Sequence, residues 1–440
     1  VFGCLFYIFV QLQMETKILA KRIADIRIRT RSYLNQNEAI AAKLMKENRR
    51  NANLSRYLSE RAGYPVYDKT NFKYYPLGDD FFPDLLEELK AAERFIFLEY
   101  FIIQRGVMWD SVLKILEEKA AAGVDVRVLY DGMNSFSNLP HDYPKELEAK
   151  GVRCRIFNPI RPAISTSQNN RDHRKILVID GHTAFTGGVN LADEYINRKV
   201  RFGHWKDNAV RLKGEAVKSF TVMFLQMWSV CAFRPEYDFD YGPFLDTGDH
   251  FHSPALNMDG YSIPFSDSPL DGEPVGHQVY LDILYQARRY VYIMTPYLIL
   301  DDDMVTALTY AAKRGVDTVI VMPHIPDKKY AFMLAHSYYP ELMEAGVKIY
   351  EYLPGFIHSK TFVSDDEKAV VGSINMDFRS QYLNFECAVY IYKNPVIGDI
   401  RADFDETLKK CVRMSMESYE SLPLMHRFWG RTLRLIAPLM

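Results

Sequence analysis

Two short stretches of the sequence combine histidine, lysine, aspartate and asparagine at the same spacing. Both follow the pattern H-x-K-x4-D-x6-G-[GS]-x-N. With ordinary residue frequencies, such a match arises by chance in a chain of this length at odds of roughly one in 10^5 per copy. The two matches therefore indicate one repeated chemical motif. Its residues are His173, Lys175, Asp180, Gly187, Gly188 and Asn190 in the first copy, and His358, Lys360, Asp365, Gly372, Ser373 and Asn375 in the second.

The spacing of histidine and lysine suits chemistry on an anion. Residues two apart on a β-strand project from the same face, so we expect each imidazole and its neighbouring ammonium group to point at one substrate, with room for a phosphate between them. The small residues of the Gly-[Gly/Ser]-x-Asn segment let backbone N–H groups approach that anion. We expect Asp180 and Asp365 to anchor strand and turn rather than to touch substrate. A single H-x-K is usually a surface feature, and its repetition is what favours catalysis.

The elements around the two motifs recur in the same order in both halves of the chain. This predicts an α/β fold with two repeats, each a mixed β-sheet flanked by helices, packed as a pseudo-dimer. Gly123 and Gly315 stand where a helix C-cap is expected. The predicted helices and strands are 82–92, 95–103, 112–122, 126–130 and 151–157 in the first half, and 279–287, 290–299, 304–314, 319–322 and 346–352 in the second.

Changes in composition suggest how the chain is divided. Residues 238–276 are rich in Pro, Gly, Asp and Ser and indicate a connecting loop. The apolar run 220–233 is typical of a buried helix, because it is too short to cross a bilayer. We expect four segments, namely 1–63 (membrane end and basic helical segment), 64–245 (first repeat), 246–415 (linker and second repeat) and 416–440 (amphipathic tail).

The two ends of the chain carry features of a membrane protein. Residues 1–10 are wholly apolar but shorter than the ~20 residues that span a bilayer. Basic residues follow at once, which is typical of the cytoplasmic flank of a truncated transmembrane helix; docking on the protein's own surface is the alternative. Residues 14–61 suit either a basic helix on anionic lipid or a solvated linker. The tail 426–440 interleaves arginines with large apolar residues, which suits an interfacial helix or one docked on the catalytic part.

Composition and charge limit the classes of function and the kind of cysteine chemistry to be expected. The 440-residue chain has a formal net charge of −2 and a pI near 6.6, so no overall positive field attracts nucleic acid. The five cysteines are scattered without metal-ligand spacing, which indicates structural thiols in a reducing compartment.

The motifs resemble the twice-repeated HKD motif of the phospholipase D superfamily at every defining position, over about residues 75–415. Within that superfamily, the longer context is similar to bacterial cardiolipin synthases, whose members carry membrane-spanning helices before the catalytic domains. The stretches that carry this likeness are HRKILVIDGHTAFTGGVNLADEY, GHWKDNAVRLKGEAV, GFIHSKTFVSDDEKAVVGSINMDFRSQYLNFE and LRLIAPLM.

The resemblance implies a covalent phosphohistidine mechanism. We assign His173 as nucleophile and His358 as general acid and base, although the near-equivalent motifs also allow the reverse. Orienting carboxylates are expected at the start of later strands, with Asp207 serving His173 and Glu386 serving His358. No metal or other cofactor is required, since basic and amide groups would stabilise the phosphorane. Those phosphate-binding residues are Lys175, Lys360, Asn190 and Asn375, with Tyr100, Tyr297 and above all Arg379 as further candidate contacts.

The activity implied by the resemblance is cardiolipin synthesis from two phosphatidylglycerol molecules with release of glycerol. A hydrolytic phospholipase D or another phosphatidyltransferase is the alternative, because no residue identifies the acceptor. A nuclease of the superfamily and an inactive membrane scaffold fit less well. The expected partners are phospholipids and a membrane, without nucleic acid, and the expected location is the cell membrane with the catalytic part facing the cytoplasm.

Overall fold

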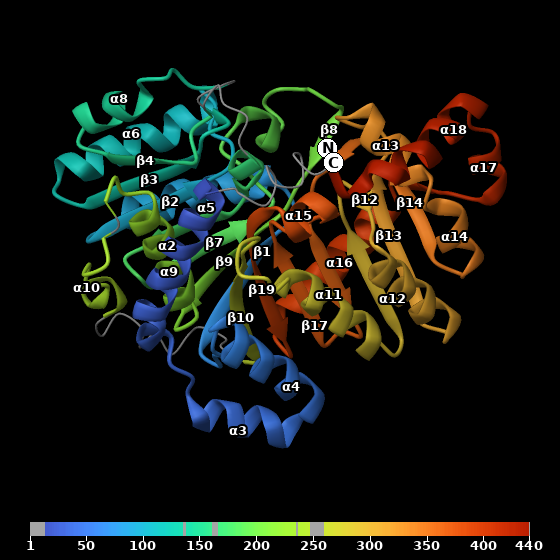
Figure 1. Ribbon diagram of the computed structural model, residues 1–440, viewed down its shortest axis with the longest axis horizontal. Helices are drawn as coiled ribbons and strands as arrows, with labels where there is room; N and C mark the ends of the chain where they lie inside the picture. The colour runs from blue at the N-terminus through green and yellow to red at the C-terminus, as the bar shows by residue number, and fades with distance from the viewer. Residues whose placement is uncertain (1–13, 135–137, 161–165, 235, 247–258, 440) are drawn as a thin grey trace, which may run out of the picture.

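The computed structural model describes residues 14–134, 138–160, 166–234, 236–246 and 259–439. Two large β-sheets lie side by side, each covered by helices (Figure 1). The strands of the first sheet are β1 (Thr70–Tyr75), β2 (Phe95–Tyr100), β3 (Asp125–Asp131), β4 (Arg153–Phe157), β6 (Lys175–Ile179), β7 (Thr183–Gly187) and β9 (Ala209–Gly214). Those on the main path of the second are β10 (Tyr261–Asp267), β11 (Tyr290–Met294), β13 (Asp317–Pro323), β14 (Lys348–Tyr352), β16 (Thr361–Ser364), β17 (Lys368–Gly372), β19 (Asn384–Tyr392) and β20 (Cys411–Arg413).

The two sheets have the same strand order. The first runs β1-β9-β7-β6-β2-β3-β4, and the second runs β10-β19-β17-β16-β11-β13-β14 with β20 added at its edge. In both, the last three strands of this shared order are parallel, and the others pair antiparallel. The duplicated arrangement of mixed sheets that the sequence predicts is therefore confirmed.

Helices follow the strands in a similar order in both repeats. Gly123 and Gly315 lie in the turns that end α6 and α12, and their φ angles of 91° and 90° are left-handed, as a glycine C-cap requires. The helices of the first repeat are α5 (Gly78–Ala91), α6 (Val107–Ala121), α8 (Tyr143–Ala149), α9 (Val217–Val230) and α10 (Gly242–Leu245). Those of the second are α11 (Val275–Gln286), α12 (Asp302–Lys313), α13 (Lys329–His336), α14 (Tyr339–Glu344), α15 (Phe378–Tyr382) and α16 (Val396–Leu408).

The prediction that 238–276 is only a connecting loop is wrong for its last part. Residues 261–267 form β10, a buried strand that pairs along its whole length with β19. The sequence does not indicate this strand, because Pro264 lies inside it and the residues on both sides of the strand are mostly polar, Gly or Pro. Proline is tolerated there because β10 is the edge strand of its sheet, whose outer side meets Tyr67 in an isolated bridge at Ser262 and not in a continuous strand pairing among the described residues.

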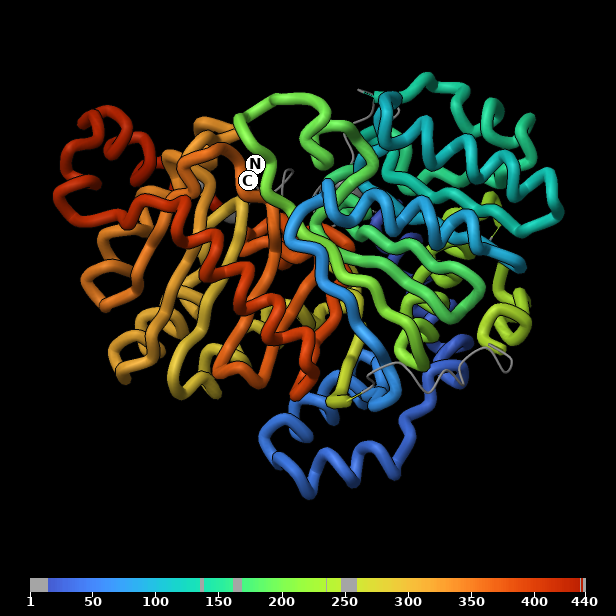
Figure 2. The backbone as a smooth tube through the Cα atoms, turned by 180° about the vertical axis from the view of Figure 1, so that it is seen from behind, coloured from blue at the N-terminus to red at the C-terminus, as the bar shows by residue number. Residues whose placement is uncertain are grey.

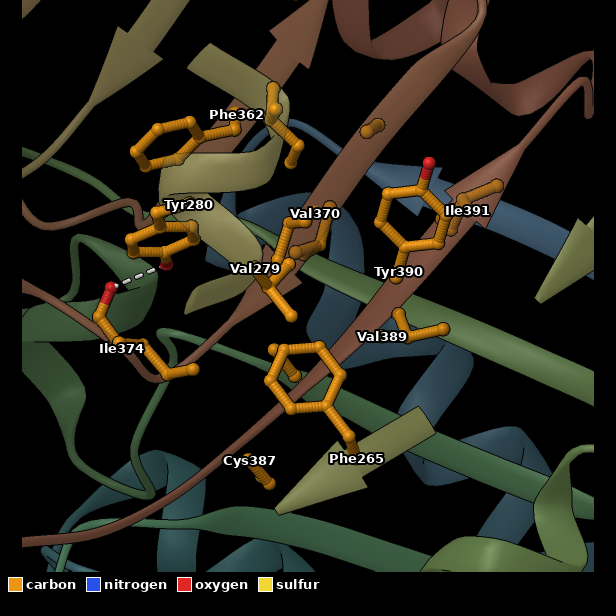
Figure 3. Close-up of a cluster of buried hydrophobic side chains, with 14 of the residues drawn as sticks. Phe265, Val279, Tyr280, Phe362, Val370, Ile374, Cys387, Val389, Tyr390 and Ile391 are labelled. Carbon is orange, nitrogen blue, oxygen red and sulfur yellow. Dashed lines mark hydrogen bonds between the residues drawn. The ribbon is translucent and has the colours of Figure 1, made fainter. Parts of the chain in front are cut away.

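The core of the second repeat is formed by large side chains from its sheet and α11. Figure 3 shows part of this cluster, in which the ring of Tyr280 stacks on Phe362 at 3.9 Å and its hydroxyl donates to the Ile374 carbonyl at 2.9 Å. Helix α9 is buried along most of its length, which confirms the predicted buried helix as far as Val230; Phe233, the last residue of the predicted run, lies beyond the helix and is 95% exposed. Tyr100, a candidate substrate contact, lies in the separate core of the first repeat.

Two helices also link the repeats. Helix α9 of the first repeat packs against β10, and α16 of the second packs against β1. Buried polar contacts accompany the second of these, since Asp403 on α16 accepts a hydrogen bond from Tyr74 at 2.7 Å and pairs with Lys206 at 2.7 Å. Each repeat therefore depends on the other for part of its packing.

The helices that precede the first sheet pack on the domain. They are α2 (Met14–Thr30), α3 (Glu38–Glu47) and α4 (Arg49–Tyr57), with short turns at Arg31–Leu34 and Leu58–Ala62. Ile26, Leu44 and Leu54 are buried, and Asn51 accepts from Tyr390 of β19 at 3.2 Å. The solvated-linker interpretation is therefore wrong. The apolar run 1–10 lies outside the described residues, and within them no helix is both long and apolar enough to span a membrane.

The chain ends in α17 (Met416–Glu420), α18 (Leu424–Leu433) and a 3-10 segment, η6 (Arg434–Leu439). Helix α18 packs on α13, and η6 reaches α15. Of the two interpretations of the tail, docking on the catalytic part is thus observed, and the outward side of α18 is exposed.

Candidate active site

His173 and His358 line one pocket of about 590 Å³. The pocket is walled by side chains from both repeats, so the two motifs meet where the repeats face each other. Aromatic rings surround the imidazoles: Phe101 lies edge-on to His173 at 5.0 Å, and Tyr195 lies edge-on to His358 at 5.5 Å. Such a setting excludes water from one side of each imidazole.

Each histidine lies between two strands rather than within one, which corrects the expectation of a continuous strand. The two-residue strand β5 (Arg171–Asp172) precedes His173, and β15 (Gly355–Ile357) precedes His358. Both pair in parallel with the other repeat, β5 with β19 and β15 with β8 (His204–Lys206). The chain must leave its own sheet to make these pairings, and this breaks the strand at the histidine.

The orienting carboxylates are crossed between the repeats. Nδ1 of His173 lies 2.9 Å from both carboxylate oxygens of Glu386, and Nδ1 of His358 lies 2.6 Å from Oδ2 of Asp207. The predicted partners were the right residues, but the predicted pairing within each repeat is wrong.

The short parallel strands explain the crossing. Asp172 of β5 is paired with Phe385 of β19, so the residues that follow them, His173 and Glu386, face each other. Ile357 is likewise paired with Lys206, which brings His358 opposite the following residue, Asp207. Backbone bonds hold the register, from His173 N to Phe385 O at 2.9 Å and from His358 N to Lys206 O at 2.7 Å.

The small residues of the motif make room for these carboxylates. A Cβ on Gly188 would overlap Oδ1 of Asp207. Ser373, at the equivalent position, instead donates its hydroxyl to Glu386, which also accepts from Ser380 at 2.6 Å. The expectation that this segment serves mainly to bring backbone N–H groups to an anion therefore needs correction, since its second residue contacts the carboxylate behind the histidine.

Asp180 and Asp365 hold the backbone at the far end of the motif strand. Asp180 accepts three backbone N–H bonds from residues 93–95, each at 2.8 Å. Asp365 accepts the equivalent three from residues 288–290, at 2.8 to 3.0 Å. Both adopt positive φ angles, of 53° and 58°. These contacts agree with the anchoring role that the sequence suggested.

Burial sets the protonation of the site. It lowers the pKa of His358 to about 4, with the nearby Lys360 charge adding to the effect, and it lowers the pKa of His173 as well. Burial raises the pKa of Glu386 to about 7. Burial alone would also raise the pKa of Asp207, but the charges of His358 and Lys360 and the hydrogen bonds that it accepts bring it below its ordinary value. Both imidazoles are thus neutral at pH 7.

The two motif lysines lie behind the histidines. Each Nζ donates to the backbone carbonyl of its own histidine, and both side chains are buried. Burial lowers the pKa of Lys175 to about 8 and that of Lys360 to about 7. Neither lysine contributes to the pocket wall formed by the described residues, although each lies close enough to depress the pKa of His173.

The motif asparagines line the pocket and differ in their bonding. Asn190 is fixed from two sides, since its Oδ1 accepts from Ile102 N at 3.0 Å and its Nδ2 donates to Tyr195 Oη at 2.8 Å. The Oδ1 of Asn375 is buried and has no hydrogen-bond partner among the described residues. An amide with unused hydrogen-bonding capacity at a pocket wall is suited to contact a ligand.

The pocket also contains cations beyond the two motifs. Arg379 and Tyr297, both candidates from the sequence, are part of its wall. Lys328, Arg171 and Arg201 are further wall residues that sequence reasoning missed. Arg171 and Arg201 form ion pairs with Asp131 and Glu194, whereas Lys328 lies over the Tyr297 ring at 5.2 Å. No sequence signal marks Lys328, because it follows a loop whose position only the fold determines.

Comparison with known proteins places these features in context. The family model described as cardiolipin synthase, PLD-like domain, matches residues 85–228 and 280–408. An uncharacterized protein of Streptococcus mutans is 50% identical over 440 residues, covering 100% of this chain and 94% of that protein. The cardiolipin synthase of Geobacillus kaustophilus is 38% identical over 366 residues, 82% of this chain and 71% of the enzyme. That of Alkalihalophilus pseudofirmus is 36% identical over 385 residues, 86% and 73%.

A crystal structure of phosphatidylserine synthase from Haemophilus influenzae resembles the chain in fold. The two superpose with a TM-score of 0.66 over 89% of this chain and 100% of the other, at 13% sequence identity. At that identity the likeness concerns the fold alone.

Proposed function

The chain belongs to the cardiolipin synthase family of the phospholipase D superfamily, and we propose that it transfers a phosphatidyl group from one phosphatidylglycerol to the glycerol headgroup of another. The products are cardiolipin and glycerol. The observation that carries the proposal is the pair of histidines in one pocket, each held at Nδ1 by a buried carboxylate. A histidine held in this way presents Nε2 to the substrate.

In the first step Nε2 of His173 attacks phosphorus, the bond from phosphorus to the glycerol oxygen breaks, and His358 donates a proton to that oxygen. In the second step His358 takes the proton of an incoming headgroup hydroxyl. The oxygen then attacks phosphorus, and the bond from phosphorus to His173 breaks.

The electrostatic difference between the carboxylates beside the two histidines supports this assignment. The acid must carry a proton, and the lowered pKa of Asp207 keeps an ionised partner beside His358 that stabilises its imidazolium form. The nucleophile must be neutral, and beside His173 burial raises the pKa of Glu386 to about 7, so this carboxylate stabilises an imidazolium less than Asp207 does. A bound phosphodiester anion offsets the lysine charges and raises the pKa of His358 toward the working range.

The motif lysines and asparagines would stabilise the charge that develops on the non-bridging oxygens. Lys175 and Lys360 act from behind the imidazoles as buried charges, and Asn190 and Asn375 act from the pocket wall. We further propose that the protein works at the cell membrane with this pocket on the cytoplasmic side, on phospholipids rather than nucleic acid. The net charge of −2 and the basic helix α2 support that choice.

The test is to incubate the purified, detergent-solubilised protein with phosphatidylglycerol and a chelator, and to measure lipid products and free glycerol. Cardiolipin with equimolar glycerol, abolished in His173→Ala and His358→Ala and retained in His141→Ala, is the expected result. His141 is the matched control because it is an exposed histidine of the first repeat outside the pocket. Phosphatidic acid instead of cardiolipin would identify a hydrolase, and no turnover of this lipid would contradict the proposal.

A further inference from the structure

Helix α18 turns a row of large apolar side chains toward solvent. Leu424, Met425, Phe428 and Trp429 are 75%, 62%, 58% and 47% exposed, and we call these four residues the outer face of α18. An amphipathic helix of a soluble protein normally buries such a face. Contiguous exposed apolar groups mark a surface that meets another apolar phase.

The other side of α18 is fixed to the protein, so the exposure does not come from a detached helix. A Cβ on Gly430 would overlap the carbonyl oxygen of Met333, which shows how closely α18 approaches α13. Nε2 of His426 lies 2.9 Å from Nδ1 of His336 on α13. The helix therefore presents its outer face in one defined orientation.

The outer face lies close to the catalytic pocket. Helix α13, on which α18 packs, supplies Tyr330 and Ala331 to the pocket wall, with Lys328 just before it. The chain after α18 contacts α15, which carries the pocket residue Arg379. In Figures 1 and 2, α18 lies along the same upper edge of the molecule as the loop before β8.

That loop has the same character as α18. Val200 is 81% exposed and lies between exposed Lys199 and Arg201, whose side chain stays 55% exposed although it pairs with Glu194; Arg201 and Phe202 line the pocket. Arg431 on α18 is exposed beside the outer face, whereas Arg434, the first residue of η6, is paired with Glu341. Apolar side chains flanked by cations match an anionic bilayer, in which the apolar groups enter the acyl boundary and the cations meet lipid phosphates.

We propose that the outer face of α18 and the loop at 198–201 dock the protein onto an anionic phospholipid bilayer, with the catalytic pocket opening toward the leaflet. This inference rests on the proposed lipid substrate. It explains how the headgroup could enter the pocket while the acyl chains stay in the membrane.

The experiment is co-sedimentation of the 440-residue chain with vesicles of phosphatidylcholine containing increasing phosphatidylglycerol. In Phe428→Ser/Trp429→Ser we expect the partition coefficient on anionic vesicles to fall roughly tenfold or more, since two partly exposed aromatic rings no longer enter the bilayer. The matched control is Tyr285→Ser/Tyr310→Ser on α11 and α12. Those rings are 46% and 53% exposed, and the helices that carry them lie away from α18 (Figure 1), so this variant should leave binding unchanged.

Turnover of monomeric short-chain phosphatidylglycerol separates docking from catalysis. The α18 double variant should keep wild-type turnover of this soluble substrate and lose turnover on vesicles. Unchanged vesicle binding in that variant would overturn the docking surface, and so would a change in oligomeric state without a change in vesicle binding, which would indicate a contact between copies. Vesicle binding that depends on α18 without cardiolipin formation would refute the proposed function and leave the docking surface standing.

Discussion

Replacing Asp207 by asparagine should impair the chemistry of His358, in the other repeat, and leave the nucleophile His173 competent. At 2.6 Å and an effective dielectric constant of about 20, an imidazolium and a carboxylate attract each other by about 6 kcal/mol. Asparagine still accepts the Nδ1–H bond, so we take about half of this as lost. That corresponds to a decrease in kcat of roughly 10^2-fold on phosphatidylglycerol.

The assay compares phosphatidylglycerol with phosphatidyl-p-nitrophenol, whose leaving group departs as an anion and needs no proton. Asp207→Asn and His358→Ala should recover most of the p-nitrophenolate burst, because only the acid is missing. Glu386→Gln and His173→Ala should lose turnover of both substrates, because they impair the nucleophile. Glu351→Gln is the matched control, since Glu351 forms a comparable buried contact with His336 at 3.0 Å and contributes nothing to the described pocket wall.

Whether Asp207→Asn behaves like His358→Ala or like His173→Ala decides which histidine Asp207 serves. If Asp207→Asn behaved like His173→Ala, with no recovery on the activated substrate, each carboxylate would act within its own repeat or the two histidine roles would be reversed. The second possibility is checked by mass spectrometry of the trapped intermediate, which should place the phosphatidyl group on His173. A trapped group on His173 together with loss of the burst in Asp207→Asn would refute the crossed arrangement.

Three further predictions concern stability and binding. Asp365→Ala leaves three backbone N–H groups without their acceptor, and we expect urea unfolding to show a loss of about 3 kcal/mol; a change under 0.5 kcal/mol would argue against the anchor. Folding lowers the pKa of His358 from its ordinary 6.5 to about 4, so between these pH values the unfolded state binds one more proton than the folded state. The free energy of unfolding should therefore fall as pH drops from 6.5 to 4, by up to about 3 kcal/mol. His358→Gln should show a shallower dependence on pH. Lys328→Gln should raise KM for phosphatidylglycerol several-fold with kcat nearly unchanged, because about 1 kcal/mol of binding to an anionic headgroup is lost. An unchanged KM in steady-state kinetics would argue against a contact between Lys328 and the headgroup.

Much of the fold could be predicted because its signals are local. The alternation of helices and strands, and glycine caps such as Gly123 and Gly315, depend on neighbouring residues only. The duplication added a second, independent copy of each signal. Even so, β10 was missed, because an edge strand tolerates Pro264 and the sequence then reads as a loop.

The site was predictable in its residue types and not in its connections. Identical spacing identified His173 and His358, and the strands after them supplied the two carboxylates. Which carboxylate reaches which histidine depends on the docking of the repeats, and separation along the chain contains no information about that. The same holds for Lys328, whose place in the pocket results from how α13 packs.

The crossed pairs have a consequence for how such a protein could arise and how it could be divided. A single repeat carries a histidine without its acid and an acid without its histidine, so it is catalytically incomplete although its own sheet is intact. Two identical copies of one repeat would complete each other by an isologous contact, in which each gives what it receives. Joining them in one chain replaces a concentration-dependent association by an intramolecular one, with an effective concentration in the millimolar range or above. Once joined, the two halves are free to diverge, and the difference between an aspartate beside one histidine and a glutamate beside the other is the kind of specialisation that a symmetric dimer could not acquire.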